Sequence, residues 1–365
     1  MSQRRVRAVY MRGGTSRCLV FHEEDLPAPG AARDRILMEA LGSPDPYGRQ
    51  LDGLGGGISS LSKACIVGPP THPDADVDYT FAQVEVRKAQ VDYAANCGNC
   101  SSAIGPFAID EKLVAAVEGE TIVRIHNTNT RKLIVAHVPV HDGEAEVTGD
   151  FELAGVAGRG ARIALDFLDP GGAGTGRLLP TGRAVEEIDG VAASLVDATN
   201  PAVWVRAADL GLRGTETPPA IDADTALMAR LERIRVEAGR RMGMAEGPGV
   251  PKVGVVAPPI AFTALDGHAF AAATADLVAR VISMGNCHRA LPLTAAMCLA
   301  VATRLPGTVA AGCAGAPAGD VRIGQPSGVL AVDAAVGRRD GAPWAERVTV
   351  YRTARRLMEG VVRIP

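Results

Sequence analysis

The chain has 365 residues, of which 47% are hydrophobic and 22% are charged, and its formal net charge is −3. This length predicts two domains with buried cores, and the weak negative charge argues against a nucleic-acid-binding surface. We find no apolar run long enough for a signal peptide or a membrane span. Seven cysteines without regular spacing do not indicate a secreted disulfide framework, so we expect a cytoplasmic protein with free thiols.

Two polar loops precede short apolar runs near the N-terminus. The stretch "MRGGTSRCLVF" (11–21) joins two predicted strands through Gly-Gly, and its hydroxyl groups can donate hydrogen bonds to an oxyanion. The stretch "GGGISSLSK" (55–63) offers further hydroxyls and ends at Lys63, where a short strand begins. A desolvated lysine can act as a base, although a solvated lysine at a strand start is the simpler alternative.

The stretch "AANCGNCSSAIGPFAID" (94–110) places two cysteines three residues apart at a predicted turn from strand to helix. A thiol at a helix N-terminus has a lowered pKa, which suits Cys97 for proton transfer. We interpret Cys100 as a buried packing residue. Zinc requires three or four ligands, and only Cys287 and His288 are candidates to complete a site, so we expect neither a metal nor a redox role.

Three segments of the first half recur in the second half, in the same order and at nearly constant spacing. They are "LVFHEEDLPA" (19–28) with "VWVRAADLGL" (203–212), "SKACIVGPP" (62–70) with "PKVGVVAPP" (251–259), and "GNCSSAI" (98–104) with "GNCHRAL" (285–291). The repeat predicts two similar α/β lobes, 1–185 and 186–365, with C-terminal residues able to pack back on the first lobe. A cleft between the lobes is the expected ligand site.

Each "GNC" turn is predicted to begin a helix, where free backbone N–H groups and the positive end of the helix dipole bind carboxylates. The alternative is that both are ordinary strand–helix turns. His288 and Arg289, at the second turn, could hold a further carboxylate or could be a solvated pair. Lys252, the counterpart of Lys63, follows no such loop and is expected to be structural.

The motifs "MRGGTSR", "SSLSK", "NCGN", "LLPTGRAVE", "DATNPAVWVRAADLGL", "VPKVGVVAPP" and "CHRALPLT" together resemble the 2-methylaconitate cis–trans isomerase family, over residues 8–355. That family includes methylitaconate Δ-isomerase and 4-oxalomesaconate tautomerase. The resemblance implies an α/β (α+β) fold of two diaminopimelate epimerase-like lobes related by internal pseudo-symmetry. It also implies a cofactor-independent proton shift on a small di- or tricarboxylate, with no metal.

The resemblance implies catalytic roles for Lys63 and Cys97 and a carboxylate-binding role for the surrounding loops. With the second turn included, the candidate substrate-binding residues are Arg12, Thr15, Ser16, Ser59, Ser60, Ser62, Asn96, Gly98, Asn99, Met284, Gly285 and His288. Racemases of the same fold use one thiol from each lobe. In the sequence repeat Cys97 corresponds to Met284, which carries no exchangeable proton, so such a racemase is disfavoured.

The expected reaction is allylic proton transfer, giving cis–trans isomerisation or a double-bond shift. The first expected substrate is 2-methylaconitate or aconitate, and the alternatives are 4-oxalomesaconate and methylitaconate. Which of Lys63 and Cys97 is the base stays open. A non-catalytic tricarboxylate-binding accessory protein is the alternative from another class. The expected partner is the small-molecule substrate alone, without nucleic acid or membrane, and the chain could form a homodimer.

Overall fold

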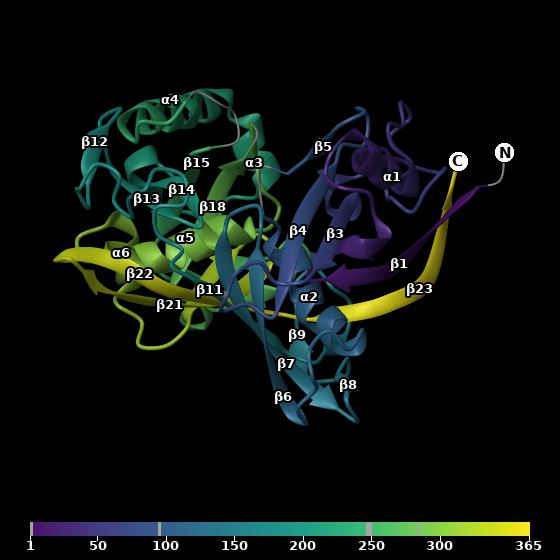
Figure 1. Cartoon of the computed structure of the whole chain (residues 1–365). Helices are drawn as coiled ribbons and strands as arrows, with labels where there is room; N and C mark the ends of the chain where they lie inside the picture. Colours follow the sequence, from purple (N-terminus) through teal and green to yellow (C-terminus); the bar gives the residue numbers. More distant parts are fainter. Residues whose placement is uncertain (1–2, 94–95, 246–249, 284) are drawn as a thin grey trace. The chain divides into compact units, whose positions relative to one another are not determined.

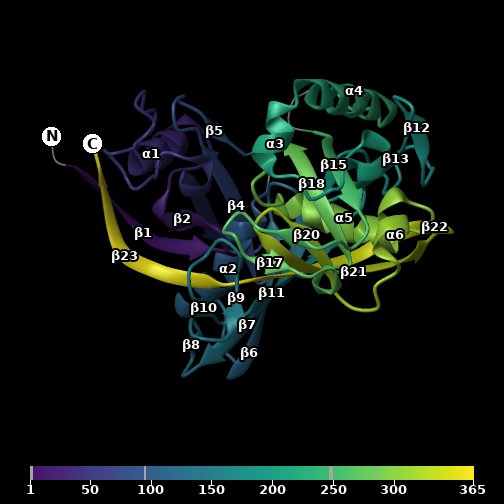
Figure 2. The ribbon, with the colours of Figure 1, turned by 180° about the vertical axis from the view of Figure 1, so that it is seen from behind.

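The chain forms two compact units (Figures 1 and 2). The structure is a computed structural model, and it describes residues 3–93, 96–245, 250–283 and 285–365. The first unit comprises Met1–Asp166 and Tyr351–Pro365, and the second comprises Phe167–Val350. Two strands, β11 (Ile163–Leu168) and β22 (Ala342–Arg352), contain the points where the chain passes from one unit to the other.

The boundary that we placed at residues 185/186 lies inside the second unit. Segment 167–185 belongs there because it is hydrogen-bonded to β13 (Val191–Ala198). The Asp197 carboxylate accepts from the backbone N–H groups of Gly174 and Thr175, at 2.8 and 2.7 Å. The Asp197 backbone N–H donates to the carbonyl oxygen of Leu178 at 2.9 Å. The turn-rich segment 175–190 is therefore part of the second unit and is not a linker.

The first unit is built on one mixed sheet. Its strands are neighbours in the order β23, β1, β2, β3, β4, β6, β7, β8, in which β2–β3 and β4–β6 are parallel and the other pairs antiparallel. β5 pairs beside β6 on the same edge of β4. The bounds are β1 (Arg4–Gly13), β2 (Ser16–His22), β3 (Lys63–Gly68), β4 (Val77–Val84), β5 (Val91–Asp92), β6 (Gly119–Asn127), β7 (Lys132–His141), β8 (Glu144–Ala145), β9 (Phe151–Glu152), β10 (Arg159–Gly160), β23 (Ala354–Ile364), α1 (Ala31–Leu41), α2 (Gly98–Asp110), η1 (Glu23–Asp25) and η2 (Ser59–Leu61).

The second unit has the corresponding sheet. Its strands run in the order β12, β13, β14, β15, β18, β20, β21, β22, and only β14–β15 and β18–β20 are parallel. No helix in the described ranges is long and apolar enough to cross a membrane. The remaining bounds are β12 (Glu186–Ile188), β14 (Asn200–Arg206), β15 (Lys252–Ala257), β16 (Phe262–Thr263), β17 (Ala269–Phe270), β18 (Leu277–Ser283), β19 (Asn286–Cys287), β20 (Val321–Gln325), β21 (Gly328–Arg339), α3 (Pro218–Ala223), α4 (Thr225–Arg241), α5 (Leu293–Arg304), α6 (Val309–Ala314), η3 (Ala207–Leu210) and η4 (Ala272–Thr274).

The predicted repeat is present in the order and direction of the elements. The series β1, β2, α1, β3, β4, β5, α2, β6, β7 in the first unit corresponds to β13, β14, α4, β15, β18, β19, α5, β20, β21 in the second. In both series the second and third strands are parallel and the helix between them joins them. Lys63 and Lys252 each begin the third strand, as the sequence comparison indicated.

The match between the two "GNC" turns is wrong at the level of structure. Gly98 begins α2, but Asn286–Cys287 form the short strand β19, and α5 begins only at Leu293. β19 pairs with the end of β18 in the same way that β5 pairs with the end of β4. Gly285 and His288 therefore flank a short strand, and the prediction that they begin a helix is corrected.

The position in the second unit that corresponds to Cys97 is Pro292. Cys97 is the N-cap residue of α2 and Pro292 is the N-cap residue of α5. The residue that we had paired with Cys97, Met284, lies outside the described residues. A proline side chain has no exchangeable proton, so the second unit still offers no second thiol at this position.

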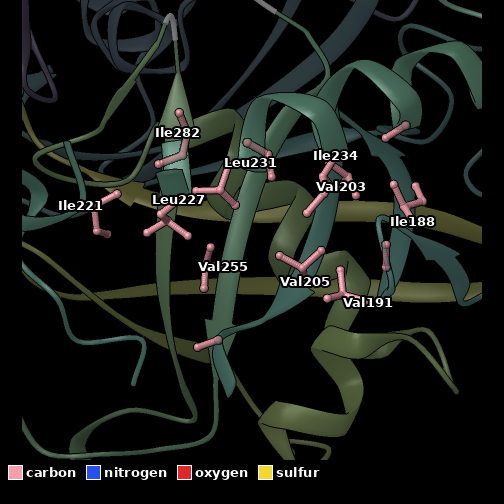
Figure 3. Packing of buried hydrophobic residues seen from close by; sticks show 14 of the residues in the cluster. Ile188, Val191, Val203, Val205, Ile221, Leu227, Leu231, Ile234, Val255 and Ile282 are labelled. Atoms are coloured by element: carbon pink, nitrogen blue, oxygen red, sulfur yellow. The ribbon is translucent and has the colours of Figure 1, made fainter. Parts of the chain in front are cut away.

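In the second unit, α4 packs on the sheet through residues spaced to lie on one side of a helix. Leu227, Leu231 and Ile234 recur at four- and three-residue intervals and face Val203 and Val205 of β14 (Figure 3). The two valines are two residues apart on the strand, so their side chains lie on the same face of the sheet. α4 therefore covers one face of this sheet with a continuous apolar stripe.

Helix α2 is the central helix of the first unit, and all its residues from Cys100 to Ile109 are buried. Small residues allow the strands to approach it closely. A Cβ atom added at Gly105 would lie only 2.7 Å from Cγ2 of Val138 and 3.1 Å from Cβ of Ala136, both on β7. The position of α2, and hence of Cys97 at its start, depends on this contact.

Gly105→Ala is expected to lower the free energy of unfolding by about 1–3 kcal/mol, because the added methyl group overpacks the α2–β7 contact. The matched control is Gly312→Ala in α6, where the nearest atom to an added Cβ is 3.9 Å away. That change should leave stability equal or raise it by up to about 1 kcal/mol, since alanine favours helix. Urea unfolding followed by circular dichroism measures both, and equal stability of the two variants would contradict the packing argument.

Candidate active site

The alternation of side chains along β2 and β3 separates two environments. Leu19 and Phe21 of β2, with Ala64 and Ile66 of β3, belong to the buried cluster that contains the apolar residues of α1. Their neighbours along the strands must point to the opposite face, because successive side chains of a strand alternate. Those neighbours are Cys18 on β2 and Lys63 and Cys65 on β3. Sγ of Cys100, in the first turn of α2, lies within 4.8 Å of the Sγ atoms of Cys18 and Cys65, so the start of α2 packs on this face of the sheet.

Cys97 is the partly exposed N-cap residue of α2. The pKa of its thiol is lowered, chiefly by a hydrogen bond from the side chain of Cys100, and further by the nearby charge of Lys63 and by the backbone N–H groups of Cys100 and Asn99. Burial opposes these effects but does not cancel them. Cys97 is therefore a thiolate near neutral pH, stabilised where the helix presents its free N–H groups.

Lys63 is almost fully buried, with 8% of its surface exposed. Its Nζ donates to Oε1 of Gln83 at 2.6 Å and lies 4.9 Å from the centre of the Phe81 ring. Burial alone would lower the pKa of Lys63, but electrostatic interaction with the nearby cysteines, chiefly the Cys97 thiolate, outweighs burial and raises it. Lys63 is therefore an ammonium group, and it is paired electrostatically with the Cys97 thiolate.

The Gly-Gly motif brings the β1–β2 hairpin against the first turn of α2. Gly13 pairs with Ser16, which leaves Gly14 and Thr15 as the turn. Gly14 has φ +52°, and a Cβ atom there would lie 2.3 Å from Oδ1 of Asn99. A Cβ atom at Gly13 would lie 2.6 Å from the Asn99 carbonyl oxygen. The two glycines are required for this close approach, which also allows Asn99 Nδ2 to donate to Thr15 Oγ1 at 3.1 Å.

Arg352 is a site residue that the sequence did not indicate. Its guanidinium is only 5% exposed; Nε donates to Oδ1 of Asn99 at 3.1 Å and Nη1 donates to the carbonyl oxygen of Tyr351 at 2.7 Å. Burial lowers the pKa of Arg352 to about 10, although the nearby Cys97 opposes this. At neutral pH it adds a second buried cation near Cys97. It stands far along the chain in no recognisable motif, and no sequence signal could have found it.

The serine-rich loop before Lys63 divides into exposed and buried residues. Ser59 is exposed and Ser60 is half-buried, so both remain candidates for ligand contact. Ser62 is fully buried; its hydroxyl donates to the carbonyl oxygen of Val84 at 2.9 Å and accepts from Nε2 of Gln50 at 2.7 Å. The prediction that Ser62 binds substrate is therefore wrong, because its side chain holds the loop in place.

Other predicted residues of the first unit brace the site. Arg12 Nη1 donates to the carbonyl oxygens of Gly14 and Thr353, at 3.0 and 2.9 Å. The Asn96 side-chain oxygen accepts from the Ser101 hydroxyl and from Asn127 Nδ2, both at 3.3 Å.

Three more predicted residues differ in exposure. Ser16 is 3% exposed, whereas Thr15 is exposed at the turn. Gly98 is buried at the first helical position of α2. Thr15 is therefore the hydroxyl of the hairpin that a ligand can reach.

The predicted residues of the second unit lie on the strand–loop segment around β19. Gly285 and His288 are both exposed. His288 Nδ1 accepts from the backbone N–H of Ala290 at 3.1 Å, and the His288 backbone N–H donates to Val281 at 2.8 Å. Lys252, the counterpart of Lys63, donates from Nζ to the hydroxyl of Ser283 at 3.0 Å, and burial lowers its pKa. The two lysines thus have opposite electrostatic environments.

Iodoacetamide is expected to modify Cys97 selectively in the folded protein. Cys97 is partly exposed, whereas the other six cysteines are buried. Its lowered pKa also means that the reactive thiolate forms at a lower pH than in an ordinary cysteine, so the labelling rate should be half-maximal below about pH 8.5. Mass spectrometry of peptides over a pH series measures this, with Cys97→Ala as the control. Labelling spread over several cysteines, or a midpoint above that pH, would contradict the environment described for Cys97.

The family model described as PrpF protein matches residues 3–365. The chain is 43% identical to 3-methylitaconate isomerase of Eubacterium barkeri, over 99% of this chain and 98% of that protein. It is 42% identical to 2-methyl-aconitate isomerase of Cupriavidus necator, over 100% and 98%.

Solved structures agree with the sequence comparisons. A crystal structure of methylitaconate-delta-isomerase matches with a TM-score of 0.92 and 42% identity, covering 100% of this chain and 96% of that one. A hydroxyproline epimerase from Agrobacterium vitis matches with a TM-score of 0.53 at 14% identity, over 100% and 94%, which shows a shared fold alone. The resemblance and the epimerase-type fold that we predicted are thus confirmed, and the chain belongs to the PrpF protein family.

Proposed function

We propose that this protein is a cofactor-independent isomerase that transfers an allylic proton on a small unsaturated tricarboxylate. One arrangement carries the proposal: buried Lys63 at the start of β3 interacts electrostatically with Cys97, the N-cap residue of α2. The pKa of the thiol is lowered and that of the amine is raised, so that a thiolate and an ammonium group lie near each other. Perturbed pKa values of this kind are characteristic of catalytic acid–base groups. A site that only bound a tricarboxylate would gain nothing from a thiolate.

The charges of the two groups suggest their roles. The Cys97 thiolate is the base that removes a proton from the carbon next to the double bond. The Lys63 ammonium stabilises the dienolate that forms and donates a proton to the far carbon. The resulting thiol and neutral amine then exchange a proton to restore the starting pair. Return of the proton after rotation about the weakened bond would give cis–trans isomerisation with the same two groups.

The substrate carboxylates are proposed to bind at the first turn of α2, where the helix dipole places positive partial charge. The backbone N–H of Gly98 is free of a helix partner at the first turn of α2, whereas those of Asn99 and Cys100 already stabilise the Cys97 thiolate. Thr15 supplies an exposed hydroxyl and Arg352 a cation nearby. These donors are fixed before substrate arrives, because Asn99 is held by both Thr15 and Arg352. Donors arranged in advance stabilise developing charge most effectively.

The substrate is proposed to be 2-methylaconitate or aconitate, with methylitaconate and 4-oxalomesaconate as alternatives. A 2-methyl-aconitate isomerase and a 3-methylitaconate isomerase are 42% and 43% identical to this chain, so overall identity does not distinguish them. A 4-oxalomesaconate tautomerase of Pseudomonas putida is 39% identical. All four acids present carboxylates on an unsaturated carbon skeleton, which is the feature that the proposed mechanism needs.

Proton NMR in heavy water with each of the four acids tests the function directly. The wild-type protein should convert one acid and exchange deuterium at its allylic carbon. Cys97→Ala and Lys63→Ala should each lower turnover at least about 100-fold, because each removes an acid–base group. The matched controls are Cys298→Ala, a buried thiol of α5, and Lys88→Ala, an exposed lysine, which should keep wild-type turnover.

Two results would contradict this proposal. Near wild-type turnover in both Cys97→Ala and Lys63→Ala would exclude proton transfer by these two residues. Binding of an acid by the wild-type protein without any exchange or conversion would favour the accessory-protein alternative.

Arg352→Lys is expected to lower kcat/KM by about 10- to 100-fold, because the variant loses the charged hydrogen bond from Arg352 that holds the Asn99 side chain in position. Lysine keeps the positive charge but cannot reproduce the planar guanidinium. Arg355→Lys, at an exposed position nearby, is the control and should change kcat/KM little. Steady-state kinetics on the acid identified by NMR measures both, and an unchanged kcat/KM for Arg352→Lys would exclude this role.

A further inference from the structure

Three thiols that are far apart in the sequence meet in the interior of the first unit. The Sγ atoms of Cys18, Cys65 and Cys100 all lie within 4.8 Å of one another, and each residue is 0% exposed. They come from β2, β3 and α2, three elements fixed by the sheet and the central helix. We call these three residues the thiol cluster. The proposed proton transfer does not use it as acid or base.

The spacing of the thiol cluster suits a metal ion of low coordination number. Three sulfurs bound at about 2.3 Å around one ion in a plane are about 4.0 Å apart, so the cluster needs only a small contraction. The Cys65 and Cys100 side chains already hydrogen-bond with Cys18. Lys63 lies within electrostatic range of all three sulfurs, and its ammonium would offset the negative charge of a thiolate complex.

The donor set selects a soft ion. Thiolate ligands favour Cu(I) and zinc over hard cations such as magnesium or calcium. Structural zinc is almost always four-coordinate, whereas Cu(I) is satisfied by two or three sulfurs. The Tyr79 hydroxyl contacts Sγ of Cys65 at 3.9 Å, too far to be a metal ligand without movement. Since the three cysteines are fully buried, solvent does not readily supply a fourth ligand.

We propose that Cys18, Cys65 and Cys100 form a three-coordinate binding site for Cu(I). Binding forms three sulfur–copper bonds and releases the thiol protons to solvent, and no electron is transferred because copper enters already reduced. Cys97, partly exposed and hydrogen-bonded to Cys100, provides a route by which the ion can pass from solvent to the cluster by ligand exchange. The thiol cluster adjoins the proposed acid–base pair, because Cys100 is hydrogen-bonded to Cys97, but binding of copper does not require the substrate.

Anaerobic titration with Cu(I), supplied as its acetonitrile complex in the presence of bicinchoninate as a competing chelator, tests the site. After desalting, the wild-type protein should retain one copper per chain by elemental analysis. Cys18→Ala and Cys65→Ala should weaken the affinity at least about 100-fold, more than the loss of a residue that only supports a ligand. Cys298→Ala, a buried thiol in the second unit, and Cys97→Ala should both still retain one copper per chain.

Four outcomes would overturn the proposal. They are no retained copper in the wild-type protein, equal retention in Cys18→Ala and Cys65→Ala, loss of copper in Cys298→Ala, and loss of copper in Cys97→Ala, which would indicate a Cys97–Cys100 pair instead. Zinc supplied in place of Cu(I) should not stay bound to the protein after desalting. One zinc per chain held by the same three residues would exclude Cu(I) as the preferred metal.

A second measurement does not depend on variants that could fail to fold. X-ray absorption of the copper-loaded wild-type protein should show a first coordination shell of three sulfurs and no nitrogen or oxygen. A shell of two sulfurs, or one that includes nitrogen or oxygen, would contradict a site made by the thiol cluster. Circular dichroism of each alanine variant, before copper is added, shows whether its fold is intact and its titration informative.

Discussion

The first unit depends on one constraint: the negative charge of the Cys97 thiolate must be stabilised where the start of α2 packs on the sheet. Removing a charge from water is costly unless other charges and hydrogen-bond donors replace the solvent. Here the replacement comes from the Cys100 thiol, the Lys63 ammonium and the free backbone N–H groups at the start of α2. Each of these requires α2 to lie directly on the sheet, and Gly13, Gly14 and Gly105 are the residues that let it do so.

The repeated architecture is used asymmetrically. In the first unit the third strand begins with a lysine whose pKa is raised, and in the second it begins with a lysine whose pKa is lowered by burial. The central helix is preceded by Cys97 in one unit and by Pro292 in the other. The same fold thus carries the proposed acid–base pair in the first unit and has no lysine–cysteine counterpart at the corresponding positions of the second. A structure that shares this fold at 14% identity belongs to a hydroxyproline epimerase, so the frame alone does not specify the chemistry.

The sequence predicted the fold, through its internal repeat and its family resemblance, and it predicted that Lys63 and Cys97 stand at the starts of a strand and a helix, where the structure has them. The catalytic roles of these two residues remain a proposal. Lys63 and Cys97 each stand at the start of an element, next to loops with a recognisable composition. The prediction that both "GNC" segments begin a helix was wrong, because the same three residues begin a helix in the first unit and form part of a short strand in the second. In the second unit Asn286 and Cys287 pair with the end of the preceding strand β18, so no helix begins there. Arg352 and the thiol cluster could not be foreseen for a different reason, since only the tertiary fold brings their parts together.

The C-terminal strand has a consequence for how the protein is made. β23 pairs with β1 along most of its length, so the last residues of the chain complete the sheet that the first residues begin. Arg352, which holds Asn99 at the start of α2, lies two residues before the start of that strand. The whole second unit is synthesised between these two parts. During translation, the second unit can fold as a continuous segment while the first unit is still missing an edge strand and a cation. The residues of the proposed catalytic site can therefore come together only after the second unit has been synthesised.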